Sequence, residues 1–366
     1  MPFSAIVRCL IALAAVAGAA PAFADLKSYN AAVLRGDFAN AANEAQATWP
    51  TLDKARADIH VIAREFGWTA MIAERPQIAK DVMTSAAALP VANAAPHLSA
   101  VLTAWADFKI KSSGETRRKL LDALKARSLQ PHADYISVRA SQELFRDEWD
   151  ANRMTSAAES AEVGAKLAGE LGEEMVDVNF AMRRYGLVSR FIQRPERADF
   201  VGIAELAGEI RTKLLAETDG KKRELLVREL ANTIAWQGVE RNVLNRRNVN
   251  LPDNIAEGDV LPVWFPAPGD PSVPECRISI DTGELRPKYP RMAQSKGLPG
   301  YAIYSFEVGE AGAFKSARVL GSAPHESFTE TIDEILPAWR WRMNSEQTGS
   351  CRMPQQHVVH FIFSLR

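Results

Sequence analysis

The sequence predicts a mostly helical protein, built as a solenoid-like array of helical hairpins and followed by a small α+β domain with an antiparallel sheet and two helices. Apolar residues recur at helical spacing over residues 25–247, and they alternate with polar residues, as in strands, over much of residues 276–366. Between these parts, residues 248–275 contain six prolines, which lack an amide donor and disfavour helices and central strands. We therefore divide the chain into a helical domain, a connector and a C-terminal domain.

The composition is that of an ordinary soluble globular protein. The 366 residues suffice for two domains, and hydrophobic and charged residues make up 47% and 24% of the chain. The formal net charge is −1, and no basic run of the kind that binds nucleic acid occurs. We expect no nucleic acid among the partners.

Residues 1–24 have the pattern of a secretory signal peptide. Arg8 precedes an apolar stretch, and the small residues Ala22 and Ala24 provide a cleavage site before Asp25. The alternative is an uncleaved membrane anchor, for which the stretch is short because a bilayer span takes about 20 apolar residues. We expect an exported chain that begins at Asp25.

Export affects how the cysteines are interpreted. Removal of the signal peptide leaves Cys276 and Cys351, and an oxidising compartment allows them to form a disulfide. Closing a loop of this length stabilises the fold by roughly 4 kcal/mol in the chain-entropy description. Two free buried thiols are the alternative.

The helical domain, residues 25–247, has the apolar period of buried helix faces, as in the row formed by Leu226, Leu230 and Ile234. About eleven helices fit between its breaks. Hairpins are predicted to begin near residues 26, 53, 96, 131, 174 and 219. This spacing is typical of helical-repeat solenoids, although a non-repetitive bundle gives a similar pattern. Residues 29–45 resemble one tetratricopeptide-type unit, because they have a small residue in the first helix, a Gly-Asp-Phe turn and Ala in the second helix.

The connector, residues 248–275, is predicted to be extended and fairly stiff because of its prolines. Val263, Trp264 and Phe265 are unusually apolar for a connector. Since exposed apolar patches are rare, we expect these three residues to pack on a neighbouring domain.

The C-terminal domain, residues 276–366, begins with a predicted strand at residues 277–281 and a turn. Pro290 suits the first turn of a helix, which ends at Gly297. The next two strands form a hairpin with a glycine-containing turn. Apolar residues at every second position, from Ala302 to Val308, share one face of the first strand. In the return strand, a β-bulge between residues 314 and 317 would keep the apolar residues on that face.

A second helix and a final strand complete this domain. The apolar face of the helix has spacings of four, three and four residues, formed by Phe328, Ile332, Ile335 and Trp339. Pro337 is expected to kink this helix or to end it. The final strand begins near Gln356. Val359, Phe361, Phe363 and Leu365 share one face of it, and the other face holds Val358, His360, Ile362 and Ser364. The order strand, helix, strand, strand, helix, strand predicts one antiparallel sheet with its helices on one face.

These landmarks and their order resemble the C-terminal periplasmic domain of the TonB family. The resemblance covers roughly residues 277–366, a quarter of the chain. The residues that carry it are Tyr289, Pro290, Ala293, Gly297, Gly300, Phe306, Val308, Gly312, Phe328, Trp339 and Arg340.

The resemblance implies that a short peptide of a transporter adds as a strand to the edge of the sheet. Backbone hydrogen bonds then supply affinity, and side chains supply register. The last strand is the expected receiving edge, and the corner at Tyr289 is a second contact region. The residues expected to contact the partner are Arg286, Lys288, Tyr289, Val358, His360, Ile362 and Ser364. Envelope proteins, including TonB-dependent outer-membrane transporters, are the expected partners, and the periplasm is the expected location.

The chain also departs from the transducers of this family, which have an uncleaved anchor and a long Pro-rich spacer. The sequence instead predicts a cleavable signal peptide, a large helical part and a short connector. It therefore favours a periplasmic protein-interaction adaptor linked to outer-membrane transport. The alternative is a TonB-type energy transducer that keeps residues 1–24 as an inner-membrane anchor.

The sequence shows no constellation of catalytic groups, so we predict that the protein is not an enzyme. Its six histidines have no metal-ligand spacing, and His357 and His360 point to opposite faces of a strand. We expect no metal and no cofactor. A hydrolase or small-molecule binding protein with a pocket among the helices is a further alternative, for which no residues stand out.

Overall fold

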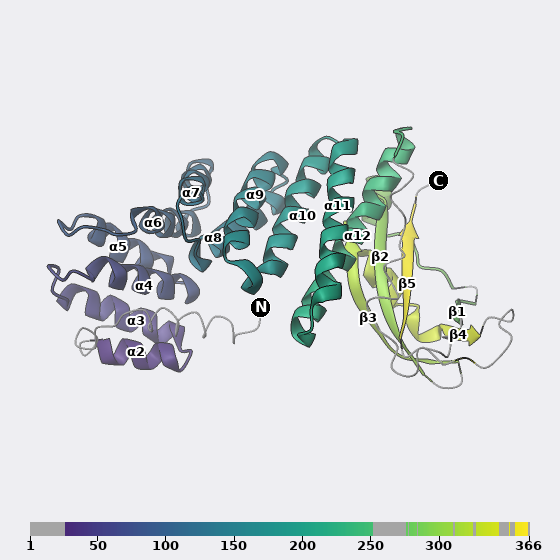
Figure 1. The fold of residues 1–366 in the computed structure, drawn as a ribbon, viewed down its shortest axis with the longest axis horizontal. Coiled ribbons are helices and arrows are strands. Elements are labelled where there is room, and N and C mark those ends of the chain that lie inside the picture. Colours follow the sequence, from purple (N-terminus) through teal and green to yellow (C-terminus); the bar gives the residue numbers. More distant parts are fainter. Residues whose placement is uncertain are drawn as a thin grey trace. The chain divides into compact units, whose positions relative to one another are not determined.

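A computed structural model of the chain describes residues 26–251, 276, 278–283, 285–309, 312–324, 327–343, 351 and 356–364. The predicted signal peptide and the apolar residues 263–265 lie outside these ranges. The chain divides into two compact units (Figure 1). Among the described residues, one unit takes 26–147 and 166–174, and the other takes 148–165 and the residues from 175 onward.

Residues 26–251 form eleven α-helices, as the sequence predicts. They are α2 (Lys27–Leu34), α3 (Phe38–Thr48), α4 (Ile59–Ile72), α5 (Pro76–Ala87), α6 (Pro96–Ile110), α7 (Gly114–Arg127), α8 (Tyr135–Asp150), α9 (Met154–Glu170), α10 (Val176–Gln193), α11 (Arg197–Ala216) and α12 (Gly220–Arg246). Short 3₁₀ turns lie at Trp49–Thr51 and Gly172–Glu174. Five of the predicted hairpin starts precede helix pairs, and the last, near residue 219, precedes the single 27-residue helix α12.

In the first unit, helices α2 to α7 pack against their neighbours in succession, which is the arrangement of a hairpin array. The turn between α2 and α3 follows the local sequence. Gly36 adopts a positive φ of 71°, which glycine tolerates without steric cost. Asp37 then caps α3, because its Oδ1 accepts a hydrogen bond of 3.1 Å from the amide of Asn40. Phe38 is buried at the start of α3.

The C-terminal domain contains five strands and two α-helices in the described ranges. They are β1 (Ile278–Asp281), α13 (Arg291–Ser295), β2 (Gly300–Val308), β3 (Phe314–Ala323), α14 (Ser327–Asp333), β4 (Arg340–Met343) and β5 (Gln356–Phe363), with a 3₁₀ turn at Leu336–Ala338. Strands β3, β2 and β5 form an antiparallel sheet in that order, and β1 pairs with β4 in a second sheet. The predicted α+β domain is therefore present.

The predicted order of elements was wrong in one respect. It had a single sheet and a second helix that reached Trp339, whereas the structure has a further strand, β4, in a second sheet. The helix α14 ends at Asp333, and Pro337 lies in the 3₁₀ turn that follows. Proline cannot donate to an α-helical hydrogen bond and clashes with the preceding turn, so the helix ends there, one of the two predicted outcomes. Residues 340–343 then pair with β1 as strand β4. The side chain of Arg342 forms an ion pair with Asp281 across the two strands.

The β-bulge predicted in β3 is confirmed. Phe314 pairs with Val308 and Ser316 pairs with Glu307, so that Lys315 is the extra residue. This shift places Ala317 opposite Phe306 on the face that the sequence assigns to the core. A second register shift, not foreseen from the sequence, makes Leu320 another extra residue.

The sheet is covered on both faces, whereas the sequence predicted helices on one face only. On one face, Ala302, Tyr304 and Phe306 pack in a core with α14 residues Phe328 and Ile332. On the other face, helix α12 of the helical domain lies along β3 and β2 (Figure 1). The residues that share this second core with α12 are Tyr301, Ile303, Leu320 and Ala323.

Two glycines allow this close approach of α12 to the sheet. A Cβ on Gly321 of β3 would lie 2.5 Å from the backbone carbon of Ala231 in α12. A Cβ on Gly238 of α12 would lie 2.2 Å from the ring of Tyr301. The backbone amide of Ser322 donates to Asn232 Oδ1 at 3.4 Å, and Arg318 forms an ion pair of 2.6 Å with Glu224. The last helix and the sheet therefore belong to one packed body.

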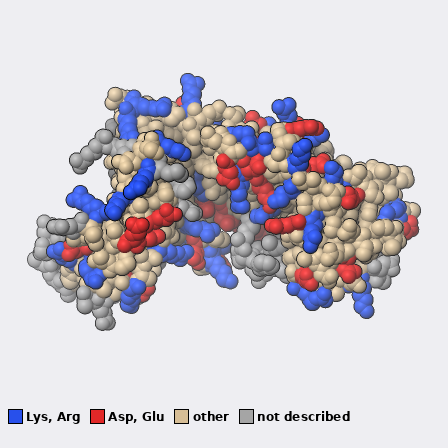
Figure 2. Space-filling view, turned by 180° about the vertical axis from the view of Figure 1, so that it is seen from behind, with Lys and Arg blue, Asp and Glu red and all other residues tan. Residues whose placement is uncertain are grey.

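Charged residues of both signs are interspersed over the face seen in Figure 2, in keeping with the net charge of −1. Within the described ranges, no helix is long and apolar enough to cross a membrane.

Helix α12 contains a buried carboxyl group, that of Glu240, which has neither a hydrogen-bond partner nor a cation beside it among the described residues. Glu240 is fully buried, and neither of its carboxyl oxygens has a hydrogen-bond partner among the described residues. Burial, and then the nearby Asp199, raise the pKa of Glu240 well above its ordinary value of 4.5. Above pH 4.5 the unfolded chain releases this proton while the folded chain retains it. The free energy of unfolding therefore falls as the pH rises from 4.5 toward the pKa of the folded state.

The substitution Glu240→Gln is expected to remove this pH dependence and to raise the free energy of unfolding at pH 7 by about 1–2 kcal/mol. Chemical denaturation between pH 4.5 and 7.5 measures the difference. Glu205→Gln, at an exposed position of α11, is the control and should follow the wild type. An unchanged slope in Glu240→Gln would contradict the assignment.

Candidate binding edge of the sheet

Strand β5 is an edge of the three-stranded sheet. It pairs with β2 over eight residues, from Gly300 opposite Phe363 to Glu307 opposite Gln356, without a register shift. In the described part of the chain, no strand pairs with its other side. In an antiparallel ladder, alternate residues turn both backbone groups away from the partner strand. The outer side of β5 therefore presents a regular row of donors and acceptors.

This edge has none of the features that usually protect a sheet from pairing with another chain. Such features are charged side chains, prolines and bulges. Residues 356–363 contain no Lys, Arg, Asp, Glu or Pro. Burial lowers the pKa of the His357 imidazole, which keeps this side chain neutral at neutral pH. Strand β5 is thus a regular edge with little charge.

The opposite edge, β3, is protected in three ways. Its two bulges, at Lys315 and Leu320, interrupt a regular row of backbone groups. Lys315 and Arg318 are exposed and carry charge. Helix α12 also lies along this strand. The contrast with β5 indicates that the sheet has one edge suited to accept a further strand.

The structure divides the four contact residues predicted in β5 and directly after it into two pairs. Ile362, with 55% of its surface exposed, and Ser364 are accessible at the C-terminal end of the strand. Val358 packs against the core shared with α12. His360 Nδ1 lies 2.7 Å from the Tyr301 hydroxyl. Val358 and His360 therefore hold β5 on the sheet, and sequence analysis missed the partnership with Tyr301 because the two residues are 59 positions apart.

The predicted contact region at Tyr289 lies beside the same end of β5. The Tyr289 ring packs edge-on against Phe363 and Phe328, with ring centroids 5.9 Å away in each case. Its hydroxyl donates to the carbonyl of Leu298. Tyr289 therefore fixes the corner, while Arg286 and Lys288 are exposed near it. The structure brings this corner and the end of β5 together.

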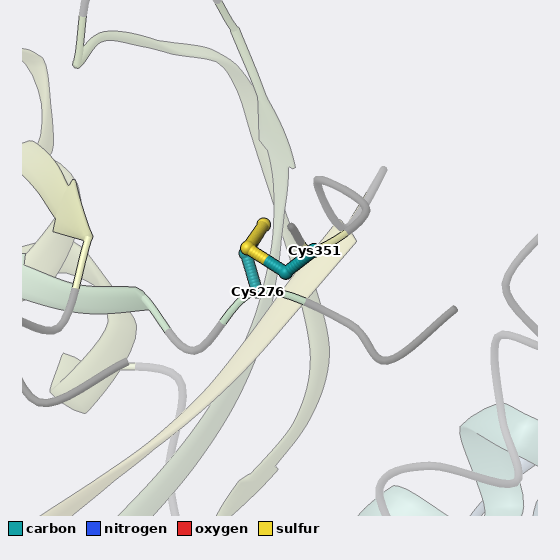
Figure 3. Close-up of a disulfide and its surroundings, with 2 residues drawn as sticks. All are labelled: Cys276 and Cys351. Carbon is teal, nitrogen blue, oxygen red and sulfur yellow. A yellow bond between two sulfur atoms is a disulfide. The ribbon is translucent and has the colours of Figure 1, made fainter. Parts of the chain in front are cut away.

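The sulfur atoms of Cys276 and Cys351 are joined, as the sequence predicts (Figure 3). The S–S distance is 2.14 Å, and the two Cα atoms are 4.9 Å apart. Cys276 precedes β1 and Cys351 precedes β5. The bond therefore ties the start of the domain to the segment that leads into the edge strand.

The arrangement of this edge suits backbone recognition. Among the described residues, no group of three or more His, Cys, Asp or Glu side chains could hold a metal ion. What the edge offers is a row of hydrogen-bonding groups, flanked by the exposed Ile362 and by the cationic side chains of Arg286 and Lys288.

A comparison with known protein families agrees with the resemblance. Residues 286–365 match the family described as Gram-negative bacterial TonB protein C-terminal. A solution NMR structure of the Pseudomonas aeruginosa TonB C-terminal domain is 26% identical over 24% of this chain and 86% of that chain, with a TM-score of 0.20. No curated protein matches the chain.

Proposed function

We propose that this chain, whose residues 286–365 form a TonB C-terminal domain, is a protein-interaction adaptor of the periplasm that captures an extended peptide on strand β5. The observation that carries the proposal is the contrast between the two edges of the sheet. Strand β5 is regular and has no Lys, Arg, Asp or Glu, whereas β3 is bulged and charged. An unprotected edge of this kind favours pairing with another strand.

In this binding mode, the backbone of the peptide supplies most of the affinity. Alternate side chains of an added strand point to opposite faces of the sheet. On one face they would lie beside Ile362 and His360, and on the other beside Phe361 and Phe363. The side chains therefore set the register of the peptide, while the hydrogen bonds with β5 hold it.

Membership of residues 286–365 in the TonB C-terminal family supports a partner in the cell envelope. We infer that the peptide belongs to an envelope protein, with TonB-dependent outer-membrane transporters as the first candidates. The domain then works by association and not by catalysis. The exported start at Asp25 and the location in the periplasm are parts of the same proposal.

Two adjacent proline variants, Val358→Pro and Val359→Pro, test the strand addition. Because neighbouring residues of β5 direct their amides to opposite sides, one of these amides faces β2 and the other faces outward. The variant that removes the outward amide should bind the peptide at least tenfold more weakly, about 1.4 kcal/mol, with little change in thermal stability. The variant that removes the amide facing β2 should lower the thermal stability of the protein, because it loses a hydrogen bond of the sheet. Titration of a labelled N-terminal peptide of an outer-membrane transporter, with thermal unfolding alongside, measures both.

A matched pair of lysine variants provides the control. Ile362 on β5 and Val319 on β3 are both exposed aliphatic residues of edge strands, at 55% and 39%. A lysine is expected to protect an edge, so Ile362→Lys should weaken peptide binding and Val319→Lys should not. Equal effects of the two variants, or full binding by both proline variants, would rule out capture at β5.

A further inference from the structure

A pocket lies at the edge of the sheet opposite to β5, where the first turns of α12 pack against strand β3. It encloses about 230 Å³ and is lined by Gly220, Arg223, Glu224, Val227, Arg228, Arg318, Val319 and Leu320. Both walls belong to the same compact unit, and α12 packs along β3. The pocket therefore lies within a single packed body, at the junction between helix and sheet.

The rim of this pocket is cationic. Three arginines and one glutamate line it, which gives a net charge of +2. Glu224 is already paired with Arg318 at 2.6 Å. Among the described residues, Arg223 donates to the backbone carbonyls of Leu214 at 3.0 Å and Glu217 at 3.1 Å and to no carboxylate, so its charge is not neutralised there. Arg228 is exposed at the rim. Guanidinium groups bind carboxylates in a planar, two-bond geometry.

The floor of the pocket is apolar. Val227 and Leu320 are buried, whereas Val319 leaves 39% of its surface exposed. A volume of about 230 Å³ is below the 300–1,000 Å³ of typical cofactor and drug pockets. The pocket therefore has room for one or two side chains, and its chemistry fits a carboxylate that stands next to an apolar group.

We propose that this junction is a second interaction surface, which binds an acidic peptide segment of a partner protein. Carboxylates of the segment pair with Arg228 and Arg318 at the rim, and a neighbouring aliphatic side chain covers Val319. The positive charge of the rim and the exposed Val319 of β3 beside it are the features that select this occupant. The surface uses the helical domain as well as the sheet, and it is separate from the β5 edge.

Fluorescence anisotropy with the full chain and a labelled Glu-Leu-Glu-Leu-Glu peptide tests this proposal. Saturable binding is expected, and it should weaken with rising salt because the contacts are partly exposed. The Gln-Leu-Gln-Leu-Gln peptide should bind at least tenfold more weakly. Arg228→Glu should reduce the affinity for the acidic peptide at least tenfold, and Val319→Ser about threefold.

Three controls decide the result. Arg118→Glu makes the same change of charge at an exposed position of α7, in the other unit, and should alter the affinity less than twofold. Ile362→Lys should leave it unchanged, which separates this surface from the β5 edge. No saturable binding, an equal loss in Arg118→Glu, or displacement by inorganic phosphate as effective as by unlabelled acidic peptide would each overturn the proposal.

Discussion

The substitution Arg184→Leu is expected to lower the free energy of unfolding by about 3–5 kcal/mol, because it leaves a buried carboxylate without its cation. Arg184 of α10 is almost wholly buried, and its Nη2 lies 2.9 Å from Glu229 Oε2 of α12. Its guanidinium also stacks over the ring of Tyr185 at 4.5 Å. Burial, and then the charge of Glu229, raise the pKa of the nearby Asp177, so a further negative charge is already unfavourable in this part of the core.

The neighbouring residue provides a matched control in the same helix. Arg183 forms two hydrogen bonds with Glu209, but that pair is largely exposed, at 37% and 50% of the side-chain surfaces. Exposed ion pairs contribute little, so Arg183→Leu should cost less than about 1 kcal/mol. Urea denaturation of both variants measures the difference.

The double variant Arg184→Leu/Glu229→Leu separates loss of the ion pair from loss of packing. Replacing both partners by apolar residues avoids the unpaired charge, so most of the lost stability should return. A double variant as unstable as Arg184→Leu alone would show that packing of the arginine, and not its charge, supports the contact between α10 and α12.

The substitution Gly321→Ala is expected to destabilise the chain by about 3 kcal/mol, since it forces a side chain into the contact between β3 and α12. The new Cβ would lie 2.5 Å from the carbon and 2.7 Å from the oxygen of the Ala231 backbone. A helix backbone cannot move aside as a side chain can. The strand must therefore separate from α12 and expose Tyr301, Ile303 and Leu320, which share a core with the helix.

Gly208→Ala in α11 is the control for Gly321→Ala. A Cβ at Gly208 meets nothing within 4 Å, and alanine is the better helix former, so this variant should be neutral or stabilising by up to about 1 kcal/mol. Hydrogen exchange should show faster exchange in both α12 and β3 of Gly321→Ala. Unchanged protection and stability would mean that the sheet does not depend on α12.

Much of the fold was predictable because its signals are local. The eleven helices follow from apolar periods and from turns such as Gly36-Asp37, where a positive φ and a capping carboxylate both come from the residues present. The bulge at Lys315 follows from the parity of the apolar residues in β3. The disulfide partners were predictable because the predicted signal peptide contains Cys9, which leaves Cys276 and Cys351 as the expected pair.

The second sheet was not predictable in the same way. Its strands β1 and β4 have four residues each and pair across about sixty positions of the chain. In a stretch as short as Arg340–Met343, the two apolar residues Trp341 and Met343 are too few to distinguish a strand from the end of a helix. Trp341 in this strand donates to the carbonyls of Gly309 and Ala313, and that partnership exists only once the hairpin of β2 and β3 has formed.

The sequence by itself determined the TonB-like domain, the alternating faces of its strands and the identity of β5 as the last strand. Only the tertiary structure decided that α12 covers the second face of the sheet and packs along the opposite edge strand β3. The physical reason is that a local pattern shows which residues require burial, whereas the element that buries them lies far away in the sequence. The nearly continuous burial of β2 from Gly300 to Phe306 is the signature of a strand covered on both faces, and its second cover comes from a helix some seventy residues earlier.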